Sequence, residues 1–146
     1  MGRVEQLLTL RVPAEAAALK VVREQLQNAL EGTGVDGDTR HQLVVAVNEA
    51  CMNVIQHAYG AQRSGDMVLM LERESGWLTF RIIDFAPTVD TSTLQPRDLS
   101  EVRPGGLGLS LIHKIMDEIR YPAPPPDGGN VLEMRKRYPP AIADGG

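Results

Sequence analysis

The sequence predicts an α+β fold, a two-layer sandwich in which helices cover one face of a mostly antiparallel sheet. Three observations support this prediction. Two long segments in the first 60 residues have the apolar spacing of amphipathic helices, two strand-like runs are separated by only two residues, and one more strand-like run lies near the end of the chain. A length of 146 residues suits a single domain, 1–146, able to bury a substantial core.

The N-terminal quarter predicts a strand followed by a helix. Residues 4–12 alternate, with Leu8, Leu10 and Val12 on one side, which indicates a half-buried strand. Pro13 suits the first turn of a helix, and the segment 14–30 has apolar residues at helical spacing. The glycines that follow Leu30 predict the end of that helix.

The middle of the chain predicts a long helix and a hairpin. Acidic cap candidates at Asp36 and Asp38 begin a helix that continues to Tyr59 and ends at Gly60. Residues 66–74 and 77–84 then form two strands, and the dipeptide between them is a short hairpin turn.

The C-terminal third predicts one more helix and one more strand. The apolar spacing of 107–120 indicates a helix, and the proline-rich segment 121–126 is expected to run extended. A last strand covers 129–138 and the tail 139–146 is expected to fray, so the core of the domain spans about 7–137. Residues 87–104 form a connection longer than compact domains normally use, which is typical of a functional lid but also of a disordered linker.

Composition excludes several classes of function. The net charge is −4 and the pI about 5.3, so the chain has no basic footprint for nucleic acid. A single cysteine, Cys51, excludes an internal disulfide and is expected to be a small core residue. No run has the length of a membrane span and no signal peptide is evident, so the expected compartment is the cytoplasm, with no membrane association.

Residues 49–60 are the most informative segment for function. Glu49, Asn53 and His57 are spaced four apart, which places them on one face of the predicted helix. A carboxylate and a carboxamide one turn apart on an otherwise apolar helix need a partner. A hydrated Mg²⁺ carrying a phosphate is one such partner, because Mg²⁺ prefers oxygen ligands and needs few of them from the protein. The alternative is an ordinary solvated helix face.

Two further motifs follow in the sequence. Asp84 comes at the end of a predicted strand, where its carboxylate could accept a hydrogen bond from a ligand or simply form a turn. The glycine-rich run 104–108 leads directly into the predicted helix at 107. Glycines allow backbone amides to approach an anion, and a helix start favours negative charge, so this run indicates a phosphate cradle or, alternatively, a flexible loop.

The three motifs together resemble the ATPase fold shared by gyrase, the 90-kilodalton heat-shock chaperones, histidine kinases and mismatch-repair ATPases. Within that fold, which is also called the Bergerat fold, the segment 49–59 is similar to the N-box of the anti-sigma-factor serine-protein kinase family, nearly position for position. Asp84 matches the adenine-contacting aspartate of the first glycine box, and 105–109 matches the second glycine box. The resemblance extends from about residue 7 to residue 137.

The resemblance implies a protein serine kinase that uses ATP and Mg²⁺. In this reading Glu49 is the general base, Asn53 holds Mg²⁺ and Asp84 receives the adenine amino group. His57 belongs to the nucleotide-binding set through packing and hydrogen bonding. The remaining implied nucleotide-binding residues lie beside or within the second glycine box: Arg103, Gly105, Gly106, Leu107, Gly108 and Leu109. The segment 87–104 corresponds to a lid over the nucleotide.

The implied partners are proteins. The phosphorylated serine would belong to an anti-anti-sigma partner of the STAS type, and the regulated target would be a sigma factor or another protein; a homodimer is also implied. Ala86 and Thr88 stand where the family commonly has glycines, which favours the alternative of a partner-switching module that does not turn over ATP. A histidine-kinase fragment is the less favoured option, since no phosphoacceptor helix pair precedes the domain.

Overall fold

The computed structural model describes residues 4–57, 65–85, 107–123 and 129–138. Its sheet has five strands in the order β1-β2-β3-β5-β4, and every neighbouring pair is antiparallel. The strands are β1 (Glu5–Pro13), β2 (Asp66–Glu74), β3 (Trp77–Asp84), β4 (Glu118–Arg120) and β5 (Asn130–Arg137). The central position of β3 therefore follows from its pairing with β2 on one side and with β5 on the other.

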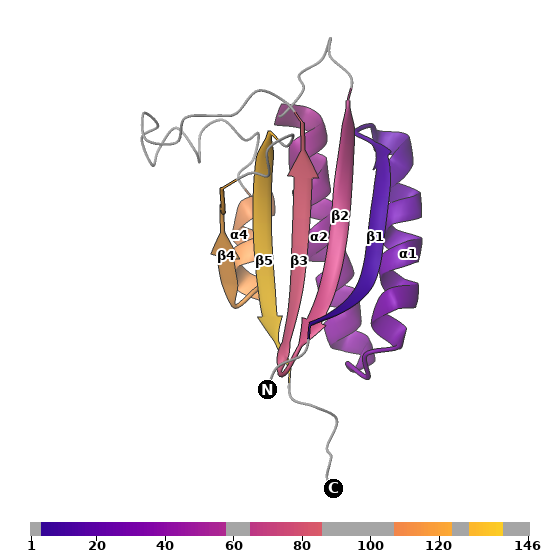
Figure 1. Ribbon diagram of the computed structural model, residues 1–146, viewed down its shortest axis with the longest axis vertical. Coiled ribbons are helices and arrows are strands. Elements are labelled where there is room, and N and C mark those ends of the chain that lie inside the picture. The colour runs from indigo at the N-terminus through magenta and orange to yellow at the C-terminus, as the bar shows by residue number, and fades with distance from the viewer. Residues whose placement is uncertain (1–3, 58–64, 86–106, 124–128, 139–146) are drawn as a thin grey trace, which may run out of the picture.

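Among the described residues, three α-helices cover one face of this sheet (Figure 1). They are α1 (Leu19–Glu31), α2 (Gly37–His57) and α4 (Leu107–Ile115), and a short 3-10 turn, η1 (Ala16–Ala18), leads into α1. Helix α2 lies between the other two and contacts both of them. The predicted α+β two-layer sandwich, with a mostly antiparallel sheet and helices on one face, is confirmed.

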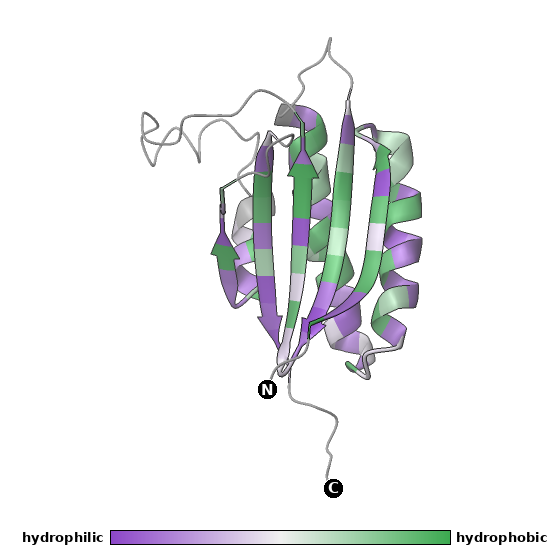
Figure 2. Ribbon diagram, viewed as in Figure 1, coloured by the Kyte–Doolittle hydropathy of each residue, from purple (hydrophilic) through white to green (hydrophobic). Residues whose placement is uncertain are grey.

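The hydrophobic core lies between the helices and the inner face of the sheet. Period-two alternation places Leu69, Leu71, Phe80 and Ile82 on that face, and each of them is at most 1% exposed. Figure 2 shows hydrophobic stretches along β2, β3 and β5, interrupted by hydrophilic bands in β3 and β5, and hydrophilic residues at the ends of β2 and β5 near the hairpin. Met67, near the other end of the sheet, is also buried. The apolar interior therefore continues toward the opposite end of the sheet, where β3 ends.

The hairpin of β2 and β3 has the predicted bounds. Glu74 pairs with Trp77 across a two-residue turn, and Gly76 has a φ of 79°, in the left-handed region that favours glycine. Helix α2 begins at Gly37, and the Asp36 carboxylate accepts a 2.7 Å hydrogen bond from the Thr39 backbone N–H. The predicted end of this helix, at residues 59 and 60, lies outside the described residues.

Two predicted boundaries are wrong. Pro13 is the last residue of β1 and not the first turn of a helix, and α1 begins only at Leu19. The helix predicted for 107–120 ends at Ile115, because Glu118–Arg120 pairs with β5 as an edge strand. Pro122 also disfavours helical backbone at the residue before it, so a helix could not have continued far.

None of the helices formed by the described residues is long and apolar enough to cross a membrane.

Candidate functional site

The ends of two strands and two helices lie together at one end of the sandwich. The C-terminal ends of β3 and α2 lie there together with the N-terminal ends of β5 and α4 (Figure 1). The antiparallel order fixes this arrangement, because Asp84 at the end of β3 pairs with Asn130 at the start of β5. The three predicted motifs belong to these ends, so the fold brings segments from three parts of the sequence to one region.

Asp84 is a buried carboxylate at this end of the sheet, only 5% exposed. Asn130 Nδ2 donates a 2.9 Å hydrogen bond to its Oδ1, and the Gly129 backbone N–H donates a 2.8 Å hydrogen bond to its backbone oxygen. Its other paired residue, Met67, is 1% exposed. Burial next to an apolar neighbour makes each hydrogen bond to this carboxylate stronger than it would be in water.

The helix period places Asn53 of α2 on the side that faces α4, with Glu49 nearer to solvent. Asn48 of α2 accepts a 3.1 Å hydrogen bond from Arg23 of α1, so this side of α2 faces α1. At about 100° per residue, Asn53 lies roughly 140° around the helix from Asn48. Because α2 is packed between α1 and α4, Asn53 is directed toward α4, and Glu49 lies between that side and solvent.

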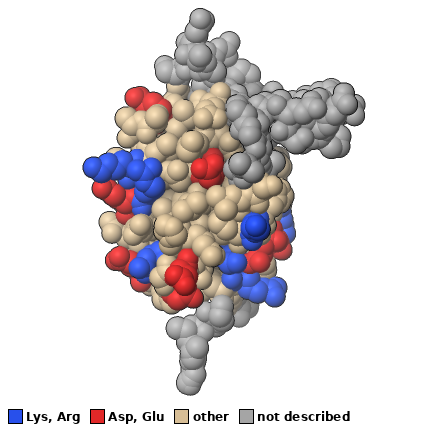
Figure 3. All heavy atoms as spheres, turned by 180° about the vertical axis from the view of Figure 1, so that it is seen from behind, with Lys and Arg blue, Asp and Glu red and all other residues tan. Residues whose placement is uncertain are grey.

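Glu49 and Asn53 are both half-buried. Within the described part of the chain, neither side chain has a hydrogen-bond or ion-pair partner. A half-buried carboxylate and carboxamide without a protein partner retain the capacity to bind a ligand or ion. In Figure 3, the upper middle of the helix-covered side shows an isolated acidic group among uncharged residues, whereas most charged groups lie lower or along one edge.

Helix α4 contributes its N-terminal end. The helix begins at Leu107, and its first turn, which the structure describes, contains no acidic residue. The first backbone N–H groups of a helix have no intrahelical acceptor and attract anions. Gly108 and Leu109 lie in the same turn. Arg103, Gly105 and Gly106, which the sequence also predicts to bind phosphate, lie outside the described residues, as does the predicted lid 87–104.

The donor set fits a magnesium nucleotide better than a metal held by protein alone. No group of three His, Cys, Asp or Glu side chains within the described residues could hold a metal ion. Mg²⁺ keeps several waters and is commonly bound through one or two protein oxygens together with substrate phosphates. The Asn53 carboxamide, which has no partner among the described residues, offers one such oxygen. His57 is the last residue of α2, so its backbone lies at the predicted end of the site.

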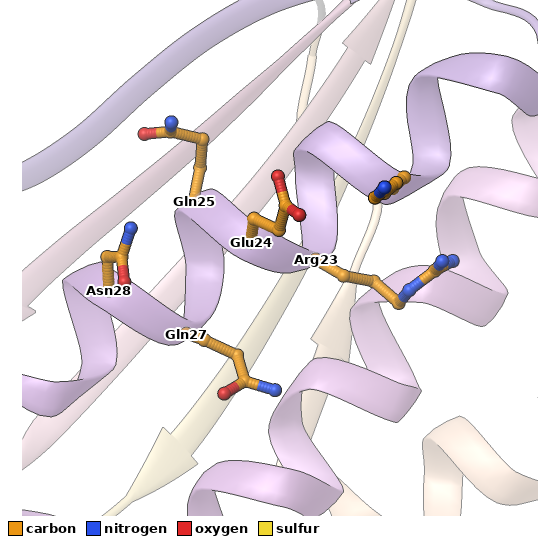
Figure 4. Close-up of a pocket in the computed structure, with 6 residues that line it drawn as sticks. Arg23, Glu24, Gln25, Gln27 and Asn28 are labelled. Carbon is orange, nitrogen blue, oxygen red and sulfur yellow. The ribbon is translucent and has the colours of Figure 1, made fainter.

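Two other features of the molecule do not belong to this site. A hollow on the outside of α1 is lined by polar side chains of that helix, among which Arg23 extends toward α2 (Figure 4). Cys51 is completely buried in the core, as predicted, and its burial raises the pKa of the thiol to about 12. A thiol that stays protonated at neutral pH does not act as a nucleophile.

Asn130 is the site residue that the sequence did not reveal. Its position after two glycines at the start of a strand gave no sign of a ligand. Its hydrogen bond to Asp84 depends on the pairing of β3 with β5, which are separated by more than 40 residues in the chain. Local periodicity cannot establish which residue lies opposite Asp84.

Comparisons with known proteins agree with this geometry. The family model of the histidine kinase-like ATPase domain matches residues 12–136. The serine-protein kinase RsbW of Bacillus subtilis is 30% identical over 122 residues, which cover 77% of this chain and 76% of the relative. The protein of the same name from Bacillus licheniformis is 27% identical over 144 residues, which cover 93% of this chain and 88% of the relative.

A solved structure has a similar fold. The RsbU and RsbW domains of Rv1364c from Mycobacterium tuberculosis superimpose with a TM-score of 0.62 at 22% identity, covering 89% of this chain and 31% of that longer chain. The fold, the gathered motifs and these relatives define a class of nucleotide-dependent enzymes and regulators. The chain belongs to the histidine kinase-like ATPase family, and within it to the anti-sigma-factor serine-protein kinase group that its motifs resemble.

Proposed function

We propose that this protein is an ATP-dependent serine-protein kinase that binds Mg-ATP at the end of the sandwich formed by β3, β5, α2 and α4. Its substrate is a serine on an anti-anti-sigma partner of the STAS type, and phosphorylation controls the release of a sigma factor or another regulated protein. The names of the relatives support the kinase activity. A homodimer remains a prediction from the resemblance.

The observation that carries the proposal is the pair Glu49 and Asn53. Both are half-buried on α2 without a partner among the described residues; Asn53 is directed toward α4, and Glu49 lies between that side and solvent. A solvated helix face would leave these groups exposed, whereas polar groups that lose part of their hydration need compensation. A nucleotide with its metal ion supplies that compensation from the side of α4.

Each residue has a role that its chemistry allows. Asp84 accepts a hydrogen bond from the exocyclic amino group of adenine, and the N-terminal amides of α4 donate to phosphate oxygens. When bound, Mg²⁺ supplies neutralisation of the phosphate charge, and the Asn53 carboxamide oxygen is the group of this chain that would hold it. Phosphoryl transfer depends mostly on positioning and charge stabilisation, so a small domain is sufficient.

Glu49 accepts the serine proton in the transfer step. The serine oxygen of the partner forms a bond to the γ-phosphorus while the bond from that phosphorus to the bridging oxygen of ADP breaks. The hydroxyl proton passes to the Glu49 carboxylate, which acts as general base. The products are the phosphoserine partner, ADP and a protonated Glu49 that returns its proton to solvent.

One observation favours a second candidate function. Ala86 and Thr88 occupy positions where the family commonly has glycines, and Pro87 between them has no backbone N–H to donate. A loop with these residues approaches a nucleotide less readily, which suits a partner-switching module with weak or no turnover of ATP.

Two measurements on the intact protein test the proposal. Calorimetric titration with ATP in the presence of Mg²⁺ determines whether the nucleotide binds. Transfer of labelled γ-phosphate to a candidate STAS-type partner, compared with a partner whose acceptor serine is replaced by alanine, determines whether the protein is a kinase. Binding without transfer supports the non-catalytic module, and no binding at all contradicts both the ATP site and the kinase.

A further inference from the structure

We propose that Arg11 of β1 is a positioning residue for the nucleotide site, because it holds Phe85 on the outer face of the sheet and so keeps the preceding residue, Asp84, on the inner face. The inference rests on the proposed ATP site and goes beyond it, since it assigns a part in nucleotide binding to an edge strand with no proposed contact to the ligand. Asp84 remains the residue proposed to contact adenine.

Arg11 contacts a carboxylate and an aromatic ring. Its Nε donates a 2.9 Å hydrogen bond to Asp66 Oδ2, and its guanidinium carbon lies 4.9 Å from the centroid of the Phe85 ring. The three residues belong to β1, to the start of β2 and to the position directly after β3. The contact therefore joins three segments at the end of the sheet where the candidate site lies (Figure 1).

The register of the sheet places this contact on the outer face. Val12 pairs with Met67, and Met67 pairs with Asp84, so these three residues form one row across the sheet. Val12 and Met67 belong to the core between the sheet and the helices, so the row faces inward. Arg11 and Phe85 are each one residue away from this row, and successive side chains of a strand point to opposite faces. The guanidinium and the ring thus lie on the face opposite to the helices.

The position of this contact gives it a role that an ordinary surface ion pair lacks. The side chains of Arg11 and Asp66 are 61% and 42% exposed, and an ion pair at such exposure adds little stability by itself. Asp84, however, is the last residue of β3, where the ordering effect of the strand ends. A shift of one residue there would turn the Asp84 side chain outward. The attraction between the guanidinium and the face of the Phe85 ring opposes such a shift.

The contact acts on nucleotide binding through the fraction of molecules that present Asp84 at the site. A protein whose binding-competent state is populated only in part binds its ligand more weakly by that fraction. An exposed guanidinium on a ring changes such an equilibrium by a few-fold rather than by orders of magnitude. We therefore expect a moderate loss of affinity when either Arg11 or Phe85 is altered. Altering both should cause no further loss, because the two changes remove the same contact.

Variants at both ends of the contact test the inference. Arg11→Met and Phe85→Leu keep the apolar bulk but remove the cation or the ring, whereas Arg11→Lys and Phe85→Tyr retain them. Calorimetry measures the dissociation constant of Mg-ATP. We expect it to rise about fivefold in Arg11→Met, in Phe85→Leu and in the double variant, and to stay within about twofold of native in the two conservative variants.

A second measurement follows the end of β3 in the protein without nucleotide. The Gly129 backbone N–H donates a 2.8 Å hydrogen bond to the backbone oxygen of Asp84, so opening of the end of β3 exposes this amide to exchange with solvent. Hydrogen exchange of the Gly129 amide, measured by NMR, should become about fivefold faster in Arg11→Met and in Phe85→Leu.

Arg73→Met is the matched control. Arg73 forms an ion pair with Glu5 between β1 and β2, the two strands that Arg11 and Asp66 also join, but at the hairpin end of the sheet. This variant should leave both the affinity and the exchange rate at native values. Circular dichroism determines whether each variant folds, and Phe85→Leu alone provides the test if Arg11→Met does not.

The outcomes are distinct. A native protein that does not bind Mg-ATP contradicts the proposed ATP site and the inference with it. Native affinity in Arg11→Met and Phe85→Leu contradicts the inference alone and leaves the proposed function intact. An equal loss of affinity in Arg73→Met, or a loss in Arg11→Met without faster exchange at Gly129, also overturns the inference, because the effect would then not come from the end of β3.

Discussion

The Lys136 ammonium donates a 3.0 Å hydrogen bond to the backbone oxygen of Ile115, the last residue of α4. The carbonyls in the last turn of a helix have no intrahelical donor, and a cation near them also interacts favourably with the helix dipole. The Asp117 carboxylate, which accepts a 2.7 Å hydrogen bond from the Arg137 N–H, attaches the following segment to β5 as well. The C-terminal end of α4 is thus fixed to the sheet, while its N-terminal end faces the candidate site.

The first prediction concerns this attachment. Lys136→Met keeps the apolar stem of the side chain and removes the donor and the charge, so the free energy of unfolding should fall by about 1 kcal/mol. Urea denaturation followed by circular dichroism measures the change. Lys20→Met, on the exposed surface of α1, is the matched control and should change the unfolding free energy by less than about 0.5 kcal/mol.

The sequence predicted the hairpin and α2 well because their signals are local. The turn residues Ser75 and Gly76 stand between two alternating runs, so the bounds of β2 and β3 follow from adjacent residues. The apolar spacing of α2 and its Asp36 cap are local in the same sense. The polar stripe of Glu49, Asn53 and His57 could be predicted from the sequence because it follows the period of the same helix.

The C-terminal end of α4 was predicted wrongly because it depends on a contact that is distant in the sequence. Ile115 and Ile119 are four residues apart and fit a helix, but Ile119 pairs with Met134 in the β4–β5 ladder. Pairing with a distant strand outweighed a weak local preference. The contact between Asp84 and Asn130 was missed for the same reason, since only the sheet order brings these two residues together.

The second prediction tests Asn53 as the metal-holding residue. Asn53→Ala should abolish measurable binding of Mg-ATP, because it removes the carboxamide oxygen that faces α4. Asn48→Ala is the control on the same helix: it loses the contact with Arg23 of α1 but leaves the α4 side unchanged. Calorimetric titration of both variants measures the effect. Native affinity in Asn53→Ala would show that this residue is not a metal ligand.

The third prediction follows from the buried thiol of Cys51. Burial raises its pKa from an ordinary 9.0 to about 12 in the folded protein. Above pH 9 the unfolded chain loses this proton while the folded protein retains it, so stability is fully present below pH 9 and falls as the pH rises toward 12. At pH 10 the loss from this group should be about 1.4 kcal/mol.

A variant isolates this contribution from the other groups that titrate at high pH. Cys51→Ala removes the thiol, so its free energy of unfolding should decrease less steeply between pH 8 and pH 10 than that of the native protein. Urea denaturation at several pH values measures both slopes. Identical slopes would mean that the Cys51 thiol reaches solvent in the folded state, in conflict with its complete burial.

The fourth prediction separates binding from catalysis at Glu49. Glu49→Gln keeps the size and polarity of the side chain but cannot take a proton, so it should lower phosphoryl transfer roughly 10²-fold or more. ATP affinity should stay within a few-fold, because the proposed metal-holding residue is Asn53 and the proposed role of Glu49 is limited to the transfer step. Single-turnover transfer to the partner measures the rate, and calorimetry measures the affinity.

A second carboxylate provides the comparison. Glu24 lies on the exposed surface of α1, so Glu24→Gln makes the same chemical change away from the site and should leave both quantities at native values. Equal losses of affinity and transfer in Glu49→Gln would instead show that Glu49 binds the metal or supports the local structure. A general base acts only in the transition state. Its role is therefore identified by a loss of phosphoryl transfer without a comparable loss of ATP affinity, rather than by the size of either change.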